Sequence, residues 1–69
     1  MLKKRSFSLS GHRTSVALEA EFWAVIDGMA KNKGQSLAAF VQAIDASRGD
    51  RPLASALRLA ALAAVTKQP

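Results

Sequence analysis

The sequence predicts a mainly α-helical domain with one short β-strand, which completes its fold as a homodimer. Two features of the hydrophobic pattern support this prediction: apolar residues alternate over residues 13–18 and then recur at helical spacing from residue 20 onward. The third feature is length, because 69 residues bury too little surface for a stable core. With no cysteine and a single histidine, the chain has neither disulfides nor a four-ligand zinc site to stabilise it. Oligomerisation is therefore the expected source of stability.

The strand is expected at residues 12–18. Its two faces alternate, with an inner face of Thr14, Val16 and Leu18 and an outer face of Arg13, Ser15 and Ala17. Residues 1–11 form either a basic N-terminal arm or an extra strand, since residues 5–10 also alternate. A lone strand leaves backbone groups unpaired, and only residues 5–10 offer it a partner within the chain. The strand therefore needs a partner, which is either residues 5–10 or a second copy of the chain.

Three helices follow, at residues 20–33, 36–48 and 52–66, all within a single domain spanning 1–69. Gly34 suits the left-handed position that ends the first helix, and Ser36 suits the N-cap of the second. Pro52 suits an early position in the third. The third helix is apolar on nearly all sides, which predicts that a neighbouring subunit covers part of it.

Positive charge is concentrated at the start of the chain. The net charge is +5, and Lys3, Lys4, Arg5 and Arg13 all precede the first acidic residue, Glu19. This distribution is typical of proteins that bind nucleic acid or another anionic surface. The sequence has no convincing targeting segment and no apolar run long enough to span a bilayer. We therefore expect a cytoplasmic, nucleoid-associated protein with no membrane partner.

Catalytic chemistry finds little support in the residues. The sequence offers no nucleophile–base pair, no cluster of metal ligands and no phosphate-binding glycine loop. We expect a protein that is not an enzyme and that uses no cofactor and no metal.

The order of strand, helix, glycine turn and helix resembles the ribbon-helix-helix repressors of the Arc and methionine repressor type. The resemblance depends on RTSVAL at 13–18 and on KGQSL at 33–37, with its Gly-x-Ser start of the second helix. GHRTSV at 11–16, EFW at 21–23 and IDASRG at 44–49 are similar to a bacterial subfamily that has a third helix. The resemblance covers about the whole chain. It implies an intertwined homodimer with an antiparallel β-ribbon between the subunits.

The resemblance also implies which residues contact DNA. The outer face of the ribbon would meet base edges in the major groove, where Arg13 can bind guanine, Ser15 can donate or accept, and Ala17 offers a methyl group. The N–H groups around Gln35 and Ser36, at the start of the second helix, would anchor phosphate. The full set of expected phosphate contacts is Lys3, Lys4, Arg5, His12, Gln35 and Ser36. The alternative for residues 3–5, a solvated tail, stays open.

The expected core of the dimer is apolar and draws on the strand and all three helices. It comprises Val16, Leu18, Phe22, Trp23, Ile26, Phe40, Val41, Ile44 and Leu57.

The sequence thus predicts a DNA-binding transcriptional regulator, in the manner of a repressor, whose partners are DNA and a second copy of itself. One alternative is an antitoxin, although the few residues after Val65 leave no tail to wrap a toxin. A second is a binder of an anionic nucleotide, such as a cyclic dinucleotide, on the basic ribbon. A third is a pure interaction module with an unknown protein partner. These classes differ in what binds the basic strand.

Overall fold

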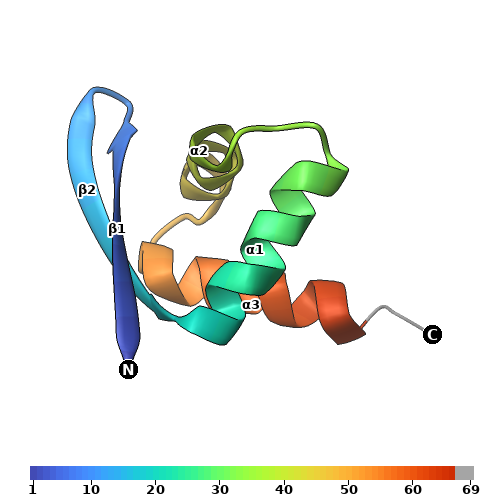
Figure 1. The fold of residues 1–69 in the computed structure, drawn as a ribbon. Coiled ribbons are helices and arrows are strands. Elements are labelled where there is room, and N and C mark those ends of the chain that lie inside the picture. The colour runs from blue at the N-terminus through green and yellow to red at the C-terminus, as the bar shows by residue number, and fades with distance from the viewer. Residues whose placement is uncertain (67–69) are drawn as a thin grey trace.

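The computed structural model describes residues 1–66 as two strands followed by three helices. Strands β1 (Leu2–Leu9) and β2 (His12–Glu19) form an antiparallel two-stranded sheet. Helices α1 (Ala20–Asn32), α2 (Leu37–Ser47) and α3 (Leu53–Thr66) follow. Figure 1 shows the hairpin standing at one side of the helices, with each helix in contact with the other two.

The second strand, β1, is the element that the sequence left undecided. Ser10 and Gly11 both have positive φ, 51° and 82°, the conformation of a two-residue hairpin turn whose twist matches the flanking strands. Because β1 folds back and pairs with β2, the backbone of β2 has a partner strand within its own chain. One edge of β2 therefore finds its partner without a second chain, and the other edge ends the sheet of the described residues.

Local chemistry sets the turn between α1 and α2. Gln35 N–H donates to the Ala30 carbonyl at 2.9 Å and Gly34 N–H donates to the Lys31 carbonyl at 3.0 Å, which is the hydrogen-bond pair of a Schellman motif. Gly34 takes φ of 66° there, which a side chain would oppose. Ser36 then caps α2, since its Oγ accepts from Ala39 N–H at 3.0 Å.

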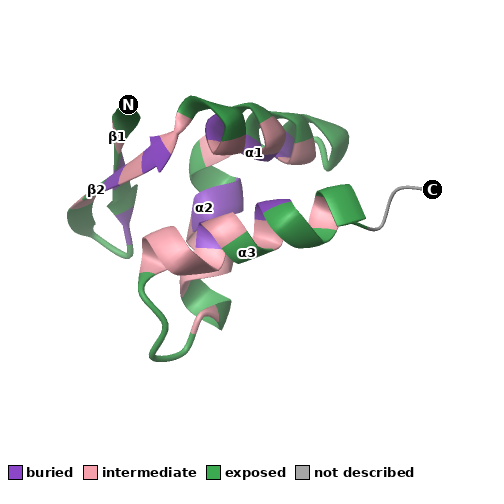
Figure 2. Ribbon diagram, turned by 90° about the horizontal axis from the view of Figure 1, so that it is seen from below, coloured by how far each residue is buried: buried purple, intermediate pink, exposed green. Residues whose placement is uncertain are grey.

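One apolar core lies between the hairpin and the helices. Buried residues occur in both strands and in all three helices (Figure 2). Its members are Phe7, Leu9, Val16, Leu18, Trp23, Ile26, Ala30, Phe40, Val41, Leu57 and Ala61. Seven of the nine residues expected in a dimer core are thus buried within a single chain, whereas Phe22 and Ile44 are half-buried.

Helix α3 leaves part of its apolar surface open. Leu57 and Ala61 are buried, but Leu59, Leu62 and Val65 are 44%, 52% and 48% exposed. The helix is therefore apolar on more sides than one chain covers, as its composition predicts.

Candidate nucleic-acid interface

The candidate interface is the outward face of the β1–β2 hairpin. Phe7, Leu9, Val16 and Leu18 point into the core, so the residues between them point away from it. The strand register places Lys4 opposite Ala17, Ser6 opposite Ser15 and Ser8 opposite Arg13. We refer to these six residues, Lys4, Ser6, Ser8, Arg13, Ser15 and Ala17, as the outer face.

The outer face is mainly polar, and four of its six residues, Ser6, Ser8, Ser15 and Ala17, have small side chains. Ser6 and Ser15 lie across the strand pair from each other, with their Oγ atoms 3.1 Å apart in a hydrogen bond. Arg13 and Ser15 are exposed and Ala17 is half-buried. The three residues that the sequence predicts for base contact therefore share one face with small hydroxyl-bearing neighbours from β1.

Arg13 and Arg5 differ in the groups around them. No acidic side chain of residues 1–66 lies within ion-pair distance of Arg13. In contrast, Arg5 points toward the helices, where its Nη1 donates to Asp27 Oδ1 at 3.0 Å and its guanidinium lies 4.7 Å from the Trp23 ring centroid. The guanidinium of Arg5 is thus engaged by two side chains of α1, whereas that of Arg13 has no acidic partner among residues 1–66.

The remaining basic residues of the hairpin lie near its two ends. Lys3 and Lys4 are exposed at the start of β1, where the Lys3 carbonyl accepts from Trp23 Nε1 at 2.7 Å. That hydrogen bond makes this backbone part of the packed structure and not a loose tail. His12 is exposed beside the turn at the other end. Of these residues only Lys4 belongs to the outer face, because Lys3 and His12 pair with the core residues Leu18 and Leu9 and therefore alternate onto the other side of the sheet.

The second group of expected phosphate contacts is the start of α2. Gln35 and Ser36 are both exposed, and no acidic residue lies in the first turn of the helix. The unpaired N–H groups and the dipole of a helix start favour an anion. Ser36 acts as the N-cap, which keeps this first turn ordered.

A side chain that the sequence does not single out connects α2 to the hairpin. Gln42 Oε1 accepts from Ser10 N–H at 2.9 Å, and Gln42 Nε2 donates to Ser10 Oγ at 3.3 Å. The two residues are 32 positions apart, so no local pattern could reveal the pair. Gln42 holds the tip of the hairpin against the middle of α2 and so fixes the outer face relative to that helix.

Two further ion pairs are internal to the fold. Arg58 of α3 donates to Glu19 at 3.1 Å, joining the end of β2 to α3. The pKa of Glu19 lies below its ordinary value, first because its own backbone N–H donates to the carboxylate and then because Arg58 does. Arg48 pairs with Asp45 at 2.7 Å.

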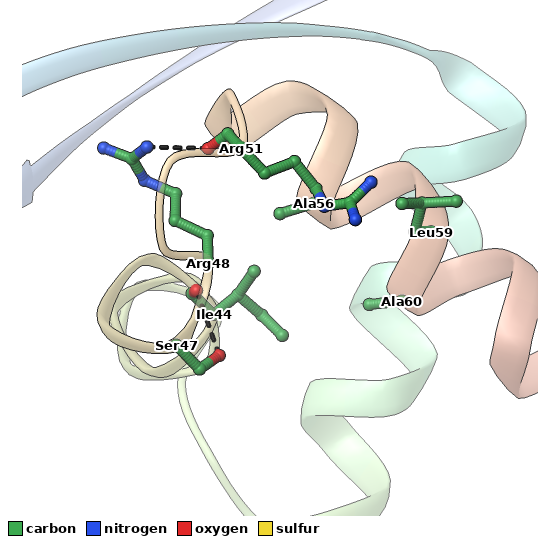
Figure 3. Close-up of a pocket in the computed structure, with 7 residues that line it drawn as sticks. All are labelled: Ile44, Ser47, Arg48, Arg51, Ala56, Leu59 and Ala60. Atoms are coloured by element: carbon green, nitrogen blue, oxygen red, sulfur yellow. Dashed lines mark hydrogen bonds between the residues drawn. The ribbon is translucent and has the colours of Figure 1, made fainter.

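An open depression of about 410 Å³ lies between α2 and α3. It is lined by Ile44, Ser47, Arg48, Arg51, Ala56, Leu59 and Ala60 (Figure 3). Arg48 donates to Asp45 and to the Arg51 carbonyl, at 2.7 Å each, so its guanidinium stabilises the loop after α2. Arg48 therefore has fewer donors left to bind an anion in this depression.

Residues 1–66 contain no group of three side chains that could hold a metal ion. In the same part of the chain, no helix is both long enough and apolar enough to cross a bilayer.

A family model described as a ribbon-helix-helix domain matches residues 2–65, which includes both strands and nearly all of the three helices. No curated protein and no solved structure matches the chain.

Proposed function

Because the chain belongs to the ribbon-helix-helix domain family, we propose that it binds DNA sequence-specifically as a homodimer and regulates transcription. Ribbon-helix-helix domains are generally DNA-binding transcription regulators. The observation that carries the proposal is the outer face, where Arg13 is exposed and has no acidic partner among residues 1–66.

The outer face has the shape and chemistry that a major groove accepts. A pair of strands about 5 Å apart fits a groove about 12 Å wide, and base edges there present distinguishable donors and acceptors. Serine and alanine side chains let the backbone approach, and Arg13 has the length and the fork of donors that guanine accepts. Arg13 is therefore the residue proposed to read sequence, with Ser15 and Ala17 contributing shorter contacts.

Contacts to phosphate would fix the position of the hairpin in the groove. The first turn of α2, with Gln35 and Ser36, is proposed as one anchor, and Gln42 connects that helix to the hairpin tip. A second copy doubles the contacts and brings the charge of the assembly to about +10, which favours association with a polyanion. The dimer would read two symmetry-related half-sites, with the β2 strands of the two copies adjacent.

Selection of bound sequences from a random DNA pool, at near-physiological salt, is the experiment that tests this function. A palindromic or pseudo-palindromic site is expected. Arg13→Ala should then lower the ratio of specific to non-specific affinity, by about 1–3 kcal/mol per lost base contact. Arg51→Ala is the matched control, because Arg51 is an exposed arginine of the loop before α3 and its loss removes the same charge.

The measured quantity is the affinity ratio, because both variants lose some non-specific attraction. A correctly folded Arg13→Ala dimer with the ratio of the unmodified protein would remove Arg13 from the readout. If the pool yields no enriched sequence, sequence-specific binding is wrong, and a calorimetric screen of anionic nucleotides becomes the next test.

A further inference from the structure

We infer that β1 widens the DNA-binding ribbon into a four-stranded sheet, ordered β1–β2–β2–β1 across two copies, in which the outer strands contact the two phosphate backbones. This inference rests on the proposed function and goes beyond it, because it assigns separate roles to the two strands. The inner pair would read bases and the outer pair would hold phosphate.

The free edge of β2 is available for a second copy. In a hairpin with a two-residue turn, Leu9 and His12 form a hydrogen-bonded pair, and hydrogen-bonded positions alternate from there. The backbone groups of Arg13, Ser15 and Ala17 therefore point away from β1. The sheet of the described residues ends at β2, and Figure 1 shows no element beyond that edge.

Charge favours β2 over β1 as the edge that meets the second copy. Residues 3–5 of β1 are three consecutive cations, and lysine-rich edges oppose pairing between like strands. Strand β2 has opposite charges near its ends. Two β2 strands paired antiparallel would therefore bring no row of like charges together at this edge, in contrast to two β1 strands.

Packing indicates that β1 stays in place when a second copy binds. Phe7 and Leu9 are 8% and 4% exposed, so removing β1 from the sheet would expose two core side chains. It would also break the Arg5–Asp27 ion pair and the hydrogen bond from Trp23 to the Lys3 carbonyl. A dimer formed at the β2 edge therefore retains all four strands.

Strand spacing then determines which residues reach phosphate. Adjacent strands are about 4.8 Å apart, so the two β1 strands would lie about 14 Å apart, wider than a major groove of about 12 Å. The β2 strands would lie over the centre of the groove and each β1 over a phosphate backbone. Lys4, Ser6 and Ser8 are the outer-face residues of β1, and each can donate a hydrogen bond to a phosphate oxygen.

Amide hydrogen exchange at two protein concentrations, one below and one above the dimer dissociation constant, tests the sheet. Above it, the amides of Arg13, Ser15 and Ala17 should become protected, because β2 gains a partner. The amides of Arg5 and Phe7 should be protected at both concentrations. If those two lose protection in the dimer, β1 has been displaced and the four-stranded sheet is wrong. Protection that never depends on concentration overturns it as well.

Salt dependence of DNA binding tests the role of β1. Lys4→Gln removes two phosphate contacts per dimer, so the slope of log K against log salt should fall by about 1.8. The ratio of specific to non-specific affinity should stay unchanged. Lys31→Gln is the matched control: Lys31 is an exposed lysine in the last turn of α1, at the end farther from the hairpin in Figure 1, and its loss should leave the slope unaltered.

The two proposals fail in different ways. If Lys4→Gln keeps the full slope while Arg13→Ala lowers the affinity ratio, the protein reads DNA but β1 does not contact phosphate. If Lys4→Gln lowers the affinity ratio, β1 contributes to sequence readout and the separation of roles is wrong. If the unmodified protein has no sequence preference, the proposed function fails, whatever the exchange experiment shows about the sheet.

Discussion

Trp23 should contribute more to stability than any other aromatic residue of the chain. It is 2% exposed and contacts three parts of β1: its Nε1 donates to the Lys3 carbonyl at 2.7 Å, the Arg5 guanidinium lies 4.7 Å from its ring centroid, and the Phe7 ring is 6.0 Å away. Trp23 therefore connects the first helix to the strand that completes the hairpin.

The expected cost of Trp23→Ala follows from these contacts. Removing a buried large aromatic side chain costs about 3–5 kcal/mol. Part of this cost is the loss of the hydrogen bond, about 1 kcal/mol, and the loss of the cation–π contact, about 0.5–1 kcal/mol. A domain of this length is stable by only about 3–10 kcal/mol, so the alanine variant is expected to be largely unfolded at room temperature or close to it.

Trp23→Phe provides a measurable step, because it keeps an aromatic ring and removes the N–H donor and part of the volume. We expect a loss of about 1–3 kcal/mol. Phe22→Ala is the neighbouring control. Phe22 is half-buried and lies 5.8 Å from the Arg58 guanidinium, so its loss should cost about 1–2 kcal/mol.

Urea unfolding of each variant, followed by circular dichroism at several protein concentrations, is the assay. A concentration-dependent midpoint identifies unfolding that is coupled to dimer dissociation. If Trp23→Ala lowered the free energy of unfolding by less than Phe22→Ala does, the assigned core face of α1 would be wrong. If Phe22→Ala lost stability only at high concentration, Phe22 would belong to the dimer interface.

Two further predictions concern the contacts that hold the hairpin to the helices. Glu19→Gln should destabilise the fold near neutral pH, because the lowered pKa of Glu19 means that the folded state favours the carboxylate. The difference in stability from the unmodified protein should shrink as the pH falls below about 4.5. A difference in stability that persists in acid would contradict this prediction. Gln42→Ala should weaken DNA binding more than it changes stability, since the Ser10 amide it releases is exposed and can bind water, with a loss of at most about 1 kcal/mol. Binding isotherms beside unfolding curves check the second prediction, and unchanged affinity would show that the hairpin tip needs no anchor.

The parts of the fold that follow from local chemistry could be predicted from the sequence. Gly34 ends α1 and Ser36 caps α2, because positive φ and side-chain capping depend on neighbouring residues only. The outward placement of Arg13 and Ser15 also follows from a period of two, which holds for any strand whose other face is buried. Family membership, predicted from the same stretches, is confirmed over residues 2–65.

What the sequence left open depends on contacts between distant residues. Residues 5–10 alternate like a strand, but only packing of Phe7 and Leu9 against the helices decides that they form one and do not remain a solvated arm.

The tertiary structure also separates two arginines that look equivalent in the sequence. Arg5 meets Asp27, 22 residues along the chain, and Arg13 meets no acidic side chain among residues 1–66. Periodicity determines which face a side chain takes, because backbone geometry repeats locally. It does not determine which group lies opposite that side chain, because that depends on how the helices pack across the sheet.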